Sequence, residues 1–417
     1  MFLVDEHNIL NLNYQDLSKE RTNNRLHNER RPSGARRPRS TSILLTQRGI
    51  GLSSFVNGCR IATMKRTTLI ALCCALQTLP VYAGSKAARS ILYTATNVVD
   101  SAASSSHYPA FTNIAKASIV IPGLKEGFVP QGLAFLPERR WFLFSGYHPK
   151  HPSPLIAVDA ESGRIEKQVR LRNLDGSDFK GHAGGVAVVG ENIVVSHRKA
   201  IHCLPLSDFL SCTNGVCTFS RKFTVTNNAS YCFCDEGVFW VGEFYEPSDS
   251  DYDTLPTHKW ESDGECFQAW LCGYKLKDGE LPLTDDGKLQ PPDYILETDK
   301  NIQGASISGG EVWLSASFNR RRSSSLMRFS SPLESEPGRY YSVDGREVPA
   351  WFLGERQRVA KITAPPMTEN LCRIGNDVFI VFESAADKYR SSVLPSKHPI
   401  DRLFFFSNSP SQKSKDD

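Results

Sequence analysis

The stretch Gln131-Gly-Leu-Ala-Phe135, followed after a turn by Trp141-Phe-Leu-Phe-Ser-Gly-Tyr147, shows the pattern that most of the chain repeats. Both runs are short, rich in aromatic and β-branched or small apolar residues, and separated by proline and charged residues. Such runs are typical of β-strands joined by a tight turn. A polar residue opens the first run and an aromatic residue ends the second. The stretch therefore predicts an antiparallel strand pair that begins with a polar residue and ends with an aromatic one.

The same order recurs along the chain at intervals of 51, 48, 73 and 66 residues. Two of these intervals are long because they contain insertions, of which the acidic, turn-rich stretch 246–265 is the clearest. The later copies begin with His182-Ala-Gly-Gly-Val, Ser230-Tyr-Cys-Phe-Cys234, Gln303-Gly-Ala-Ser-Ile and Glu369-Asn-Leu-Cys-Arg373. Helical periodicity is hard to find from about Ala117 onward. The repeat thus predicts one kind of all-β unit used five times.

Each copy continues with a third and usually a fourth strand, in the first copy Leu155–Asp159 and Arg164–Leu171. Four antiparallel strands in roughly 40–50 residues are typical of a β-propeller blade. The fifth copy ends after its third strand, Arg402–Phe406, and Ala117–Pro122 has no partner of its own. We therefore predict an all-β, five-bladed β-propeller closed by pairing of the N- and C-terminal strands. Six blades, if 84–116 contributes more than a strand, and a β-sandwich are the alternatives.

The N-terminal part of the chain has a different composition. Residues 19–48 contain nine Lys and Arg against two Glu, with no sustained apolar period, which predicts a basic disordered extension over 1–63. Met64-Lys-Arg66, the apolar run Leu69–Leu76 and Val81-Tyr-Ala83 together resemble a signal peptide cleaved before Gly84. Met64 would then be the true start. A buried helix over 64–83 and a basic arm that binds nucleic acid are the other readings.

The remaining boundaries follow from this division: 84–116 is expected to be a leader, as a short helix or a mobile segment, 117–406 the β-propeller, and 407–417 a disordered tail. Residues 1–83 carry twelve Lys and Arg against five Asp and Glu, so the rest of the chain has a net charge of about −3. That balance favours no nucleic-acid partner. No apolar run approaches the roughly 20 residues of a membrane span. We expect a secreted or periplasmic protein.

Eight cysteines follow residue 84, and an even number in an exported domain indicates disulfides. Cys212 and Cys217 flank the turn signal Asn214-Gly215, which predicts one bridge that closes a hairpin loop. Zinc is the alternative use of the cysteines. Zinc sites usually contain CxxC pairs, and this chain has none, so no metal site is predicted from the cysteines.

The sequence resembles a family of exported bacterial β-propellers. The matching motifs are Val129-Pro-Gln-Gly-Leu-Ala, Gly181-His-Ala-Gly-Gly-Val, Trp240-Val-Gly-Glu-Phe, Ile302-Gln-Gly-Ala-Ser and Met367-Thr-Glu-Asn. More distantly, it is similar to the gluconolactonase, strictosidine-synthase and paraoxonase group of propellers. That resemblance implies a Ca²⁺ site at the starts of the inner strands, where Glu369 and Asn370 are the pair whose oxygens suit the ion, and it implies a lactone as substrate.

In a propeller the first strands begin, and the second strands end, on one face around the central channel. Register can slip by one residue, which would turn a side chain to the other face. The strand starts hold Gln131, His182, Ser230, Gln303, Glu369 and Asn370. The ends of the second strands hold Tyr147, His148, His197, Arg198, Glu243, Tyr245, Asn319, Arg320 and Glu383. We expect the two sets to share one shallow cleft.

Four of these residues are candidate catalytic groups, namely Glu243, Glu369, Glu383 and His182, because paired carboxyl groups in a cleft can act as acid and base on a glycosidic bond. The candidate ligand-binding residues are Gln131, Tyr147, His197, Tyr245, Gln303, Asn319, Arg320 and Asn370. The Arg-rich loop from Asn319 to Ser325 suits a phosphate, sulfate or carboxylate. Solvated channel residues without a ligand are the plainer reading.

The sequence thus favours a ligand-binding or scaffold module that presents its channel face to a small molecule, a sugar or an anion. The alternative is a glycoside or lactone hydrolase that uses the channel carboxylates, with Ca²⁺ as its one candidate cofactor. GxSxG, HExxH, P-loop and Rossmann signatures do not occur in the chain, so the sequence lends no support to a serine hydrolase, a zinc protease or a nucleotide-dependent enzyme.

Overall fold

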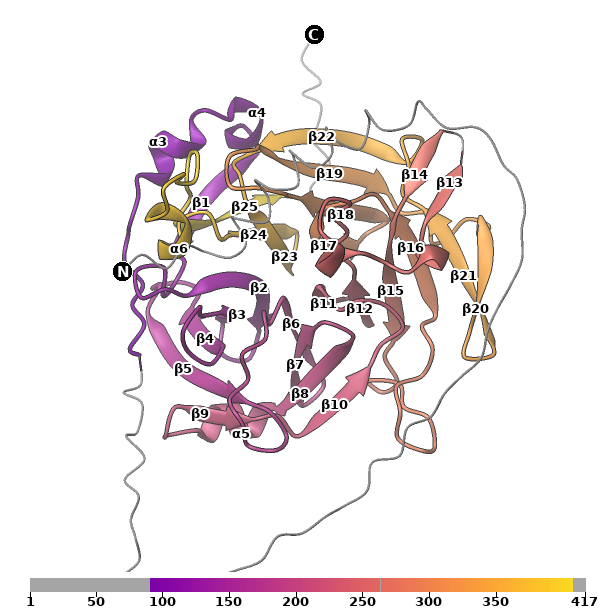
Figure 1. Cartoon of the computed structure of the whole chain (residues 1–417), viewed down its shortest axis with the longest axis horizontal. Coiled ribbons are helices and arrows are strands. Elements are labelled where there is room, and N and C mark those ends of the chain that lie inside the picture. Colours follow the sequence, from indigo (N-terminus) through magenta and orange to yellow (C-terminus); the bar gives the residue numbers. More distant parts are fainter. Residues whose placement is uncertain (1–90, 263, 408–417) are drawn as a thin grey trace, which may run out of the picture. The chain divides into compact units, whose positions relative to one another are not determined.

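The computed structural model describes residues 91–262 and 264–407, and these form five larger sheets arranged around a common centre, together with one separate two-stranded sheet (Figure 1). The chain is therefore a five-bladed β-propeller, as the repeats predict. Figure 1 shows the first strand of each blade nearest the centre of the ring. The predictions for 1–63, for the signal peptide 64–83 and for the tail from 408 lie outside the described residues.

Blades 1 and 2 each begin with one sequence copy. Blade 1 contains β2 (Val129–Leu136), β3 (Trp141–Tyr147), β4 (Pro154–Asp159) and β5 (Ile165–Arg172). Blade 2 contains β6 (Gly185–Val189), β7 (Asn192–His197), β8 (Ala200–Pro205) and β10 (Arg221–Thr224), with α5 (Leu206–Ser211) after its third strand. The short strand β9 (Val216–Thr218) lies between the third and fourth strands of blade 2 in the sequence. It belongs to the sheet of blade 1, where it pairs in parallel with the outer strand β5.

Blade 3 contains β11 (Tyr231–Asp235), β12 (Val238–Gly242), β15 (Ala269–Lys275) and β16 (Tyr294–Thr298). The insertion between β12 and β15 forms η1 (Ser250–Tyr252), η2 (Pro256–His258), β13 (Trp260–Ser262) and β14 (Glu265–Phe267). Blade 4 contains β17 (Ile302–Ser308), β18 (Glu311–Ala316), β19 (Ser324–Ser330) and β22 (Arg358–Ala364). Its hairpin β20 (Arg339–Val343) and β21 (Arg346–Phe352) pairs in parallel with β16, and so extends blade 3. This pairing and that of β9 cover outer strand edges that would otherwise be free.

Blade 5 joins the beginning and the end of the described chain. It contains β23 (Thr368–Ile374), β24 (Asp377–Phe382), β25 (Arg402–Ser407) and, as its outer strand, β1 (Ala115–Val120). Lys116 pairs with Phe405 in the antiparallel β1–β25 ladder. The predicted closure of the ring by its terminal strands is therefore confirmed.

A buried carboxylate fastens the segment before β1 to the same blade. Asp401 accepts hydrogen bonds from the backbone N–H groups of Val98 and Val99, at 2.7 and 3.0 Å, and from the Ser101 hydroxyl at 2.6 Å. Between residue 91 and β1 the chain forms α3 (Ser101–Ser105) and α4 (Pro109–Thr112). Phe111 of α4 packs on Phe404 of β25, with ring centroids 5.2 Å apart. The N-terminal segment is thus part of the core of blade 5.

Small residues allow the inner strands of neighbouring blades to approach closely. A Cβ atom on Gly185 would lie 2.1 Å from the backbone nitrogen of Cys232 in the next blade, and one on Gly304 would lie 2.5 Å from the Cα of Asn370. The hydroxyl of Ser145 donates to the Ala183 carbonyl at 2.8 Å, and that of Ser315 donates to the Glu369 carbonyl at 2.6 Å. Three of the five copies therefore contain glycine within three residues of the opening residue, because a neighbouring backbone occupies the place of a side chain.

The eight cysteines of the described residues are thiols. The Cys212 thiol donates to the Asn214 side-chain oxygen and to the Val216 carbonyl, both at 3.4 Å, within the predicted hairpin loop. The Cys212–Cys217 bridge is not formed in the structure, and it stays a prediction. In the part of the chain that the structure describes, the helices are all too short and too polar to cross a bilayer.

The close approach of blades 2 and 3 can be tested by a single methyl group. Gly185→Ala should lower the free energy of unfolding by at least about 3 kcal/mol, the upper part of the usual range for overpacking, because the new Cβ meets backbone atoms that cannot move aside. Gly176→Ala is the matched control: Gly176 has φ of +79° but no atom within 4 Å of the new Cβ, so only about 1–2 kcal/mol of backbone strain is expected. Urea unfolding followed by tryptophan fluorescence measures both losses. Equal losses would contradict the packing described here.

Candidate functional site

The centre of the channel face holds two carboxyl groups from blade 5. Glu369 lies on β23, near its start, and Glu383 directly follows β24, so the hairpin register brings both to the same end of the blade. The two side chains are hydrogen-bonded to each other. Their exposed fractions are only 2% and 8%. A carboxyl–carboxyl hydrogen bond needs a proton, so the pair shares one.

Burial is the main reason why this proton is held. Burial, followed by the charge of Glu383, raises the pKa of Glu369 well above its usual value. Burial also raises the pKa of Glu383, to about 7, although Lys388, Tyr389, Glu369 and Gln131 act in the opposite direction. Two carboxylates in contact cannot both ionise without strong repulsion. Near neutral pH Glu369 therefore keeps its proton while Glu383 gains or loses one around pH 7, and this titration belongs to both groups.

Amide and phenol groups from three blades complete the environment of the pair. The Gln131 side-chain amide donates to Glu383 Oε2 at 2.8 Å, from the first strand of blade 1. The Gln303 amide donates to Glu369 Oε1 at 3.3 Å, from the first strand of blade 4. The Tyr389 hydroxyl donates to Glu383 Oε2 at 3.1 Å. Two predicted strand-start residues and both carboxyl groups thus meet, as their common register leads one to expect.

Aromatic rings form a wall beside the carboxyl pair. The hydroxyls of Tyr147 and Tyr389 lie 3.2 Å apart, and the Lys388 ammonium donates to the Tyr147 hydroxyl at 3.0 Å. The ring of Tyr147 stacks on that of His182, with centroids 4.6 Å apart and planes 16° from parallel. Burial, and then the Glu383 carboxylate, raise the pKa of Tyr147. Tyr147 therefore remains a neutral phenol that can donate or accept a hydrogen bond.

The rim of this cluster contains further residues expected from the sequence. The His182 backbone N–H donates to Nδ1 of His197 at 3.3 Å. Burial lowers the pKa of His197 to about 4, and the neighbouring His182 acts in the same direction, so the ring is neutral at physiological pH. The Arg320 guanidinium lies 5.1 Å from the centroid of the Tyr389 ring. Asn319, at φ of +79°, turns the chain at this point.

Glu243 has a different place from the other two glutamates. It follows β12 as Glu383 follows β24, but its carboxylate accepts hydrogen bonds from the backbone N–H groups of Asn228 and Trp270, at 3.0 and 2.9 Å. His258 of the 246–265 insertion contacts the same carboxylate through Nδ1 at 2.9 Å. The side chain is 1% exposed. The expected carboxylate trio is therefore a pair plus one separate carboxylate that is committed to the packing of the insertion.

Asn370 and Tyr245 also serve the framework. The Asn370 amide donates to the Cys232 carbonyl at 2.9 Å, which links the inner strand of blade 5 to that of blade 3. The Asn370 side-chain oxygen accepts from the Leu371 N–H at 2.9 Å, so both ends of this side chain are occupied. The buried Tyr245 ring lies under the Lys259 ammonium, 4.7 Å from the ring centroid. Neither side chain is directed to the carboxyl pair by these contacts.

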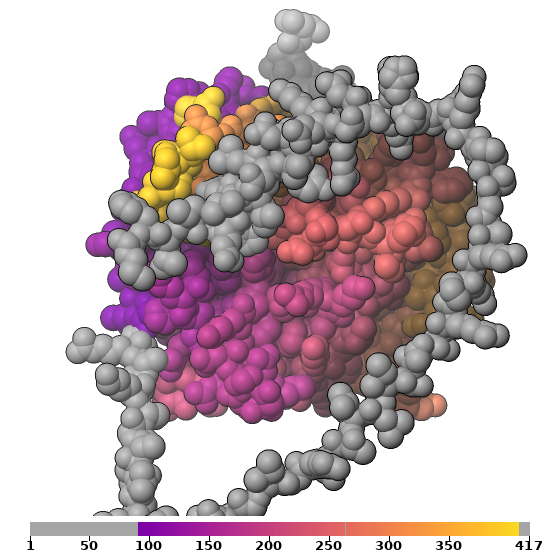
Figure 2. Space-filling view, viewed as in Figure 1, coloured from indigo at the N-terminus to yellow at the C-terminus, as the bar shows by residue number. Residues whose placement is uncertain are grey.

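Three residues of the site were not among the candidate catalytic and ligand-binding residues predicted from the sequence. Tyr389 and Lys388 lie on α6 (Asp387–Arg390), in the connection that follows Glu383. Tyr252 belongs to the insertion, and the charges of Glu383 and Glu369 contribute to raising its pKa to about 12, after burial and Asp249. In Figure 2 the segment that follows β12, in coral, lies on the face turned to the viewer. A tyrosine in a loop of variable length gives no sequence signal.

The Ca²⁺ site implied by the resemblance can be compared with the side chains present at the channel face. Ca²⁺ takes six to eight oxygen ligands, usually with several carboxylates. The channel offers two carboxyl groups that share a proton, and both Gln131 and Gln303 turn their amide nitrogens, not their oxygens, toward them. Within residues 91–262 and 264–407 no group of three or more His, Cys, Asp and Glu side chains is gathered as a metal site requires. This arrangement fits Ca²⁺ poorly.

Comparison with known proteins gives only remote likenesses. No family model and no curated protein matches the chain. Similar solved structures include hydrazine synthase of Kuenenia stuttgartiensis, 11% identical over 62% of this chain and 57% of that one, with a TM-score of 0.30. Glutaminyl cyclase of Myxococcus xanthus is 13% identical over 70% of this chain and 94% of that one, with a TM-score of 0.33. A gluconolactonase of Xanthomonas campestris is 12% identical over 68% and 88%, with a TM-score of 0.30.

The chain spans less than two thirds of the hydrazine synthase chain, and the three TM-scores are low. These likenesses carry no argument about activity. The function must therefore be argued from the geometry of the site itself.

The shared proton predicts how stability depends on pH. Between the usual value of 4.5 and about 7 the folded state keeps a proton on Glu383 that the unfolded chain has lost, so stability falls as the pH rises through this range. One retained proton corresponds to a slope of about 1.4 kcal/mol per pH unit. Glu383→Gln should reduce the slope by about this amount, because Glu369 keeps a proton of its own in the folded state, and the variant should be relatively more stable at pH 8 than at pH 5. Thermal unfolding by circular dichroism at a series of pH values measures the difference.

The control for this experiment is Glu161→Gln, which changes an exposed carboxylate in the turn between β4 and β5. It should follow the wild-type curve. Parallel curves for the wild type and Glu383→Gln would show that Glu383 does not retain a proton between pH 4.5 and about 7.

Proposed function

We propose that this protein is an exported binding module that takes a hydroxyl-rich small molecule, of the sugar class, at its channel face. The single observation that carries the proposal is the buried, proton-sharing pair Glu369–Glu383, surrounded by two amides and three tyrosines. Burying two acids costs free energy that folding alone does not recover. Such a pair suits a ligand whose polar groups replace the hydrogen bonds within it.

The groups around the pair match what a sugar offers. A half-protonated carboxyl pair both donates and accepts hydrogen bonds, and a sugar hydroxyl does the same. The amides of Gln131 and Gln303 add donors, and by rotation acceptors. The stacked rings of Tyr147 and His182 provide a flat aromatic surface for the apolar face of a sugar ring. Few placed polar groups with aromatic neighbours are usual in small-molecule sites.

A hydrolase that acts on a glycoside or a lactone is the second candidate. One observation favours it: with a pKa of about 7, Glu383 can act as an acid or a base near neutral pH. The short distance between the two carboxyl groups argues against a glycosidase. In those enzymes the paired carboxyl groups lie about 5–10 Å apart, to leave room for the sugar or for water. Glu369 and Glu383 are instead in hydrogen-bond contact. Binding needs no such separation, and so it is the better supported function.

The test is a thermal-shift screen of the full chain against mono- and disaccharides, sugar lactones and Ca²⁺, at pH 7. A ligand of the channel raises the melting temperature with concentration, and at 100 times its Kd it adds about 2.7 kcal/mol to stability. Glu369→Gln and Glu383→Gln should each weaken binding by about tenfold or more, because a charged partner of the ligand is lost. Glu161→Gln should bind as the wild type does.

The same samples distinguish the two candidate functions. A sugar that stabilises the protein and is recovered unchanged supports the binding module, whereas release of product that stops in Glu383→Gln supports the hydrolase. Stabilisation that is equal in the wild type and in both glutamine variants would place the ligand elsewhere and contradict the proposal.

A further inference from the structure

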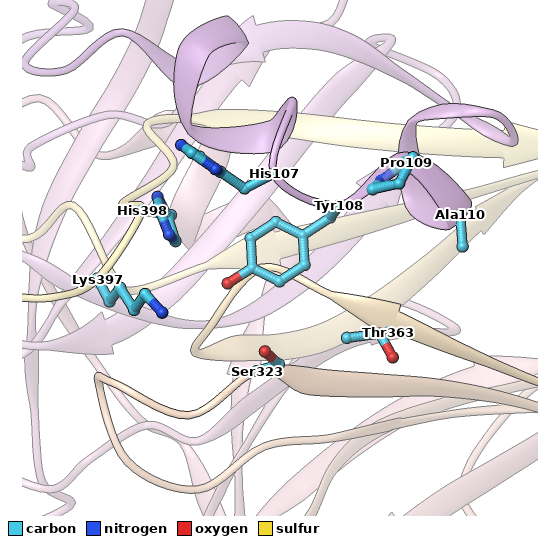
Figure 3. Close-up of a pocket in the computed structure, with 8 residues that line it drawn as sticks. All are labelled: His107, Tyr108, Pro109, Ala110, Ser323, Thr363, Lys397 and His398. Carbon is cyan, nitrogen blue, oxygen red and sulfur yellow. The ribbon is translucent and has the colours of Figure 1, made fainter.

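A second hollow lies outside the carboxyl cluster, at the junction of blades 4 and 5. It has a volume of about 450 Å³. Its floor and walls come from the connection between α3 and α4, from the residue before β19, from β22, and from the connection that leads into β25. Figure 3 shows Tyr108 in its middle, with the hydroxyl end of the ring turned toward Lys397 and Ser323. The hollow thus draws together four segments that are distant in sequence.

The polar groups of this hollow are cationic groups and hydroxyls. Its lining includes His107, Lys397 and His398 together with the hydroxyls of Tyr108, Ser323 and Thr363, and no carboxylate is among the lining residues. The rings of His107 and His398 lie with centroids 3.9 Å apart. His398 takes φ of +52°, a strained conformation for this residue type, and so is held in place by its surroundings. Three basic side chains meet here without an acidic partner.

The charges that face His398 all have the same sign. Burial, then His107, then the adjacent Lys397 lower the pKa of His398. His107 approaches it from the α3–α4 connection, and Lys397 from its own connection. An anion in the hollow would reverse this balance, because it would interact favourably with the protonated form of His398 and with the Lys397 ammonium group.

The surface beside the hollow continues the positive charge. The Lys397 backbone N–H donates to the Arg320 carbonyl at 2.9 Å, and the Arg321 guanidinium donates to the Pro395 carbonyl at 3.3 Å. The loop 319–322 and the loop 391–398 are therefore joined. At the tip of the second loop Val393 and Leu394 are 99% and 64% exposed. An apolar tip thus stands beside a row of basic groups.

We propose that this hollow binds an oxyanion of the phosphate-ester class. His107, Lys397 and His398 supply the positive charge, and Tyr108, Ser323 and Thr363 supply hydroxyl donors, which is a common composition of phosphate sites. A soluble phosphate ester and the headgroup of an anionic phospholipid share this chemistry. The exposed tip of Val393 and Leu394 would add apolar contact with a lipid surface but none with a soluble ester.

Sulfate is the first probe, because it stays a dianion from about pH 6 to pH 8 while histidines titrate in that range. Titration calorimetry of the full chain at constant ionic strength should show binding that is tighter at pH 6 than at pH 8, with proton uptake. Lys397→Gln and His398→Gln should each weaken binding by about tenfold. Lys125→Gln, an exposed lysine outside the hollow, is the matched control and should bind as the wild type does.

The second experiment separates the two sources of the anion. Methyl phosphate and vesicles of phosphatidylcholine with phosphatidic acid are offered to the wild type and to Val393→Ser/Leu394→Ser. Methyl phosphate binding that both proteins show equally, without vesicle binding, identifies a soluble ester. Vesicle binding that is lost in the serine variant and in Lys397→Gln identifies a lipid headgroup.

Glu383→Gln should leave sulfate binding unchanged, so a failure of the channel proposal does not affect this one. Sulfate affinity that is equal in the wild type, Lys397→Gln and His398→Gln, or that does not depend on pH, would overturn the proposal.

Discussion

The hydrogen-bonded ladder between β1 and β25 holds the ring together, and the position of the carboxyl pair depends on it. Without β1, blade 5 would have three strands and an open outer edge, and the contact between blades 5 and 1 would rest on side chains alone. Asp401 reinforces the ladder from within, because its carboxylate satisfies two backbone N–H groups of the incoming segment. The closed ring then sets Gln131 of blade 1 against Glu383 of blade 5, at 2.8 Å. The candidate site therefore lies at the junction of blades 5 and 1, where the terminal strands close the ring.

Close approach of the inner strands determines where a ligand can enter. Glycines of blades 1, 2 and 4 and the hydroxyls of Ser145 and Ser315 bring inner strands against the neighbouring blade, and Asn370 bridges blade 5 to blade 3 through the Cys232 carbonyl. The inner strands are thus closely packed at these points. Polar groups that could meet a ligand remain at the channel face, where loops after the second strands enclose them. Such loops can vary without disturbing the framework.

The sequence predicts the five blades and their closure because each blade repeats the same order of short apolar strands and turns, and because the first and last strands each lack a partner in sequence. It also predicts that Gln131, Glu369, Glu383, Tyr147 and His182 approach one another, because equal register places them at one end of their strands. It does not predict the separate role of Glu243, because His258 and the Trp270 backbone reach that carboxylate only through the folded insertion. The sequence does not place Tyr252, Lys388 and Tyr389 beside the carboxyl pair for a similar reason. Their positions depend on connections that lie outside the repeat.

The closure of the ring and the position of the carboxyl pair both depend on the pairing of Lys116 with Phe405. This pairing can be tested directly by disulfide trapping. Lys116→Cys with Phe405→Cys should form a bridge under mild oxidation, because directly opposed strand residues lie within the Cα separation of a disulfide. The shifted pair Lys116→Cys with Phe404→Cys should not, since these side chains point to opposite faces of the sheet. Mass-spectrometric peptide mapping under non-reducing conditions identifies the bridge among the native cysteines. A linked peptide only for the first pair is the expected result; a link for the shifted pair, or for neither, would mean that the ring is not closed in this way.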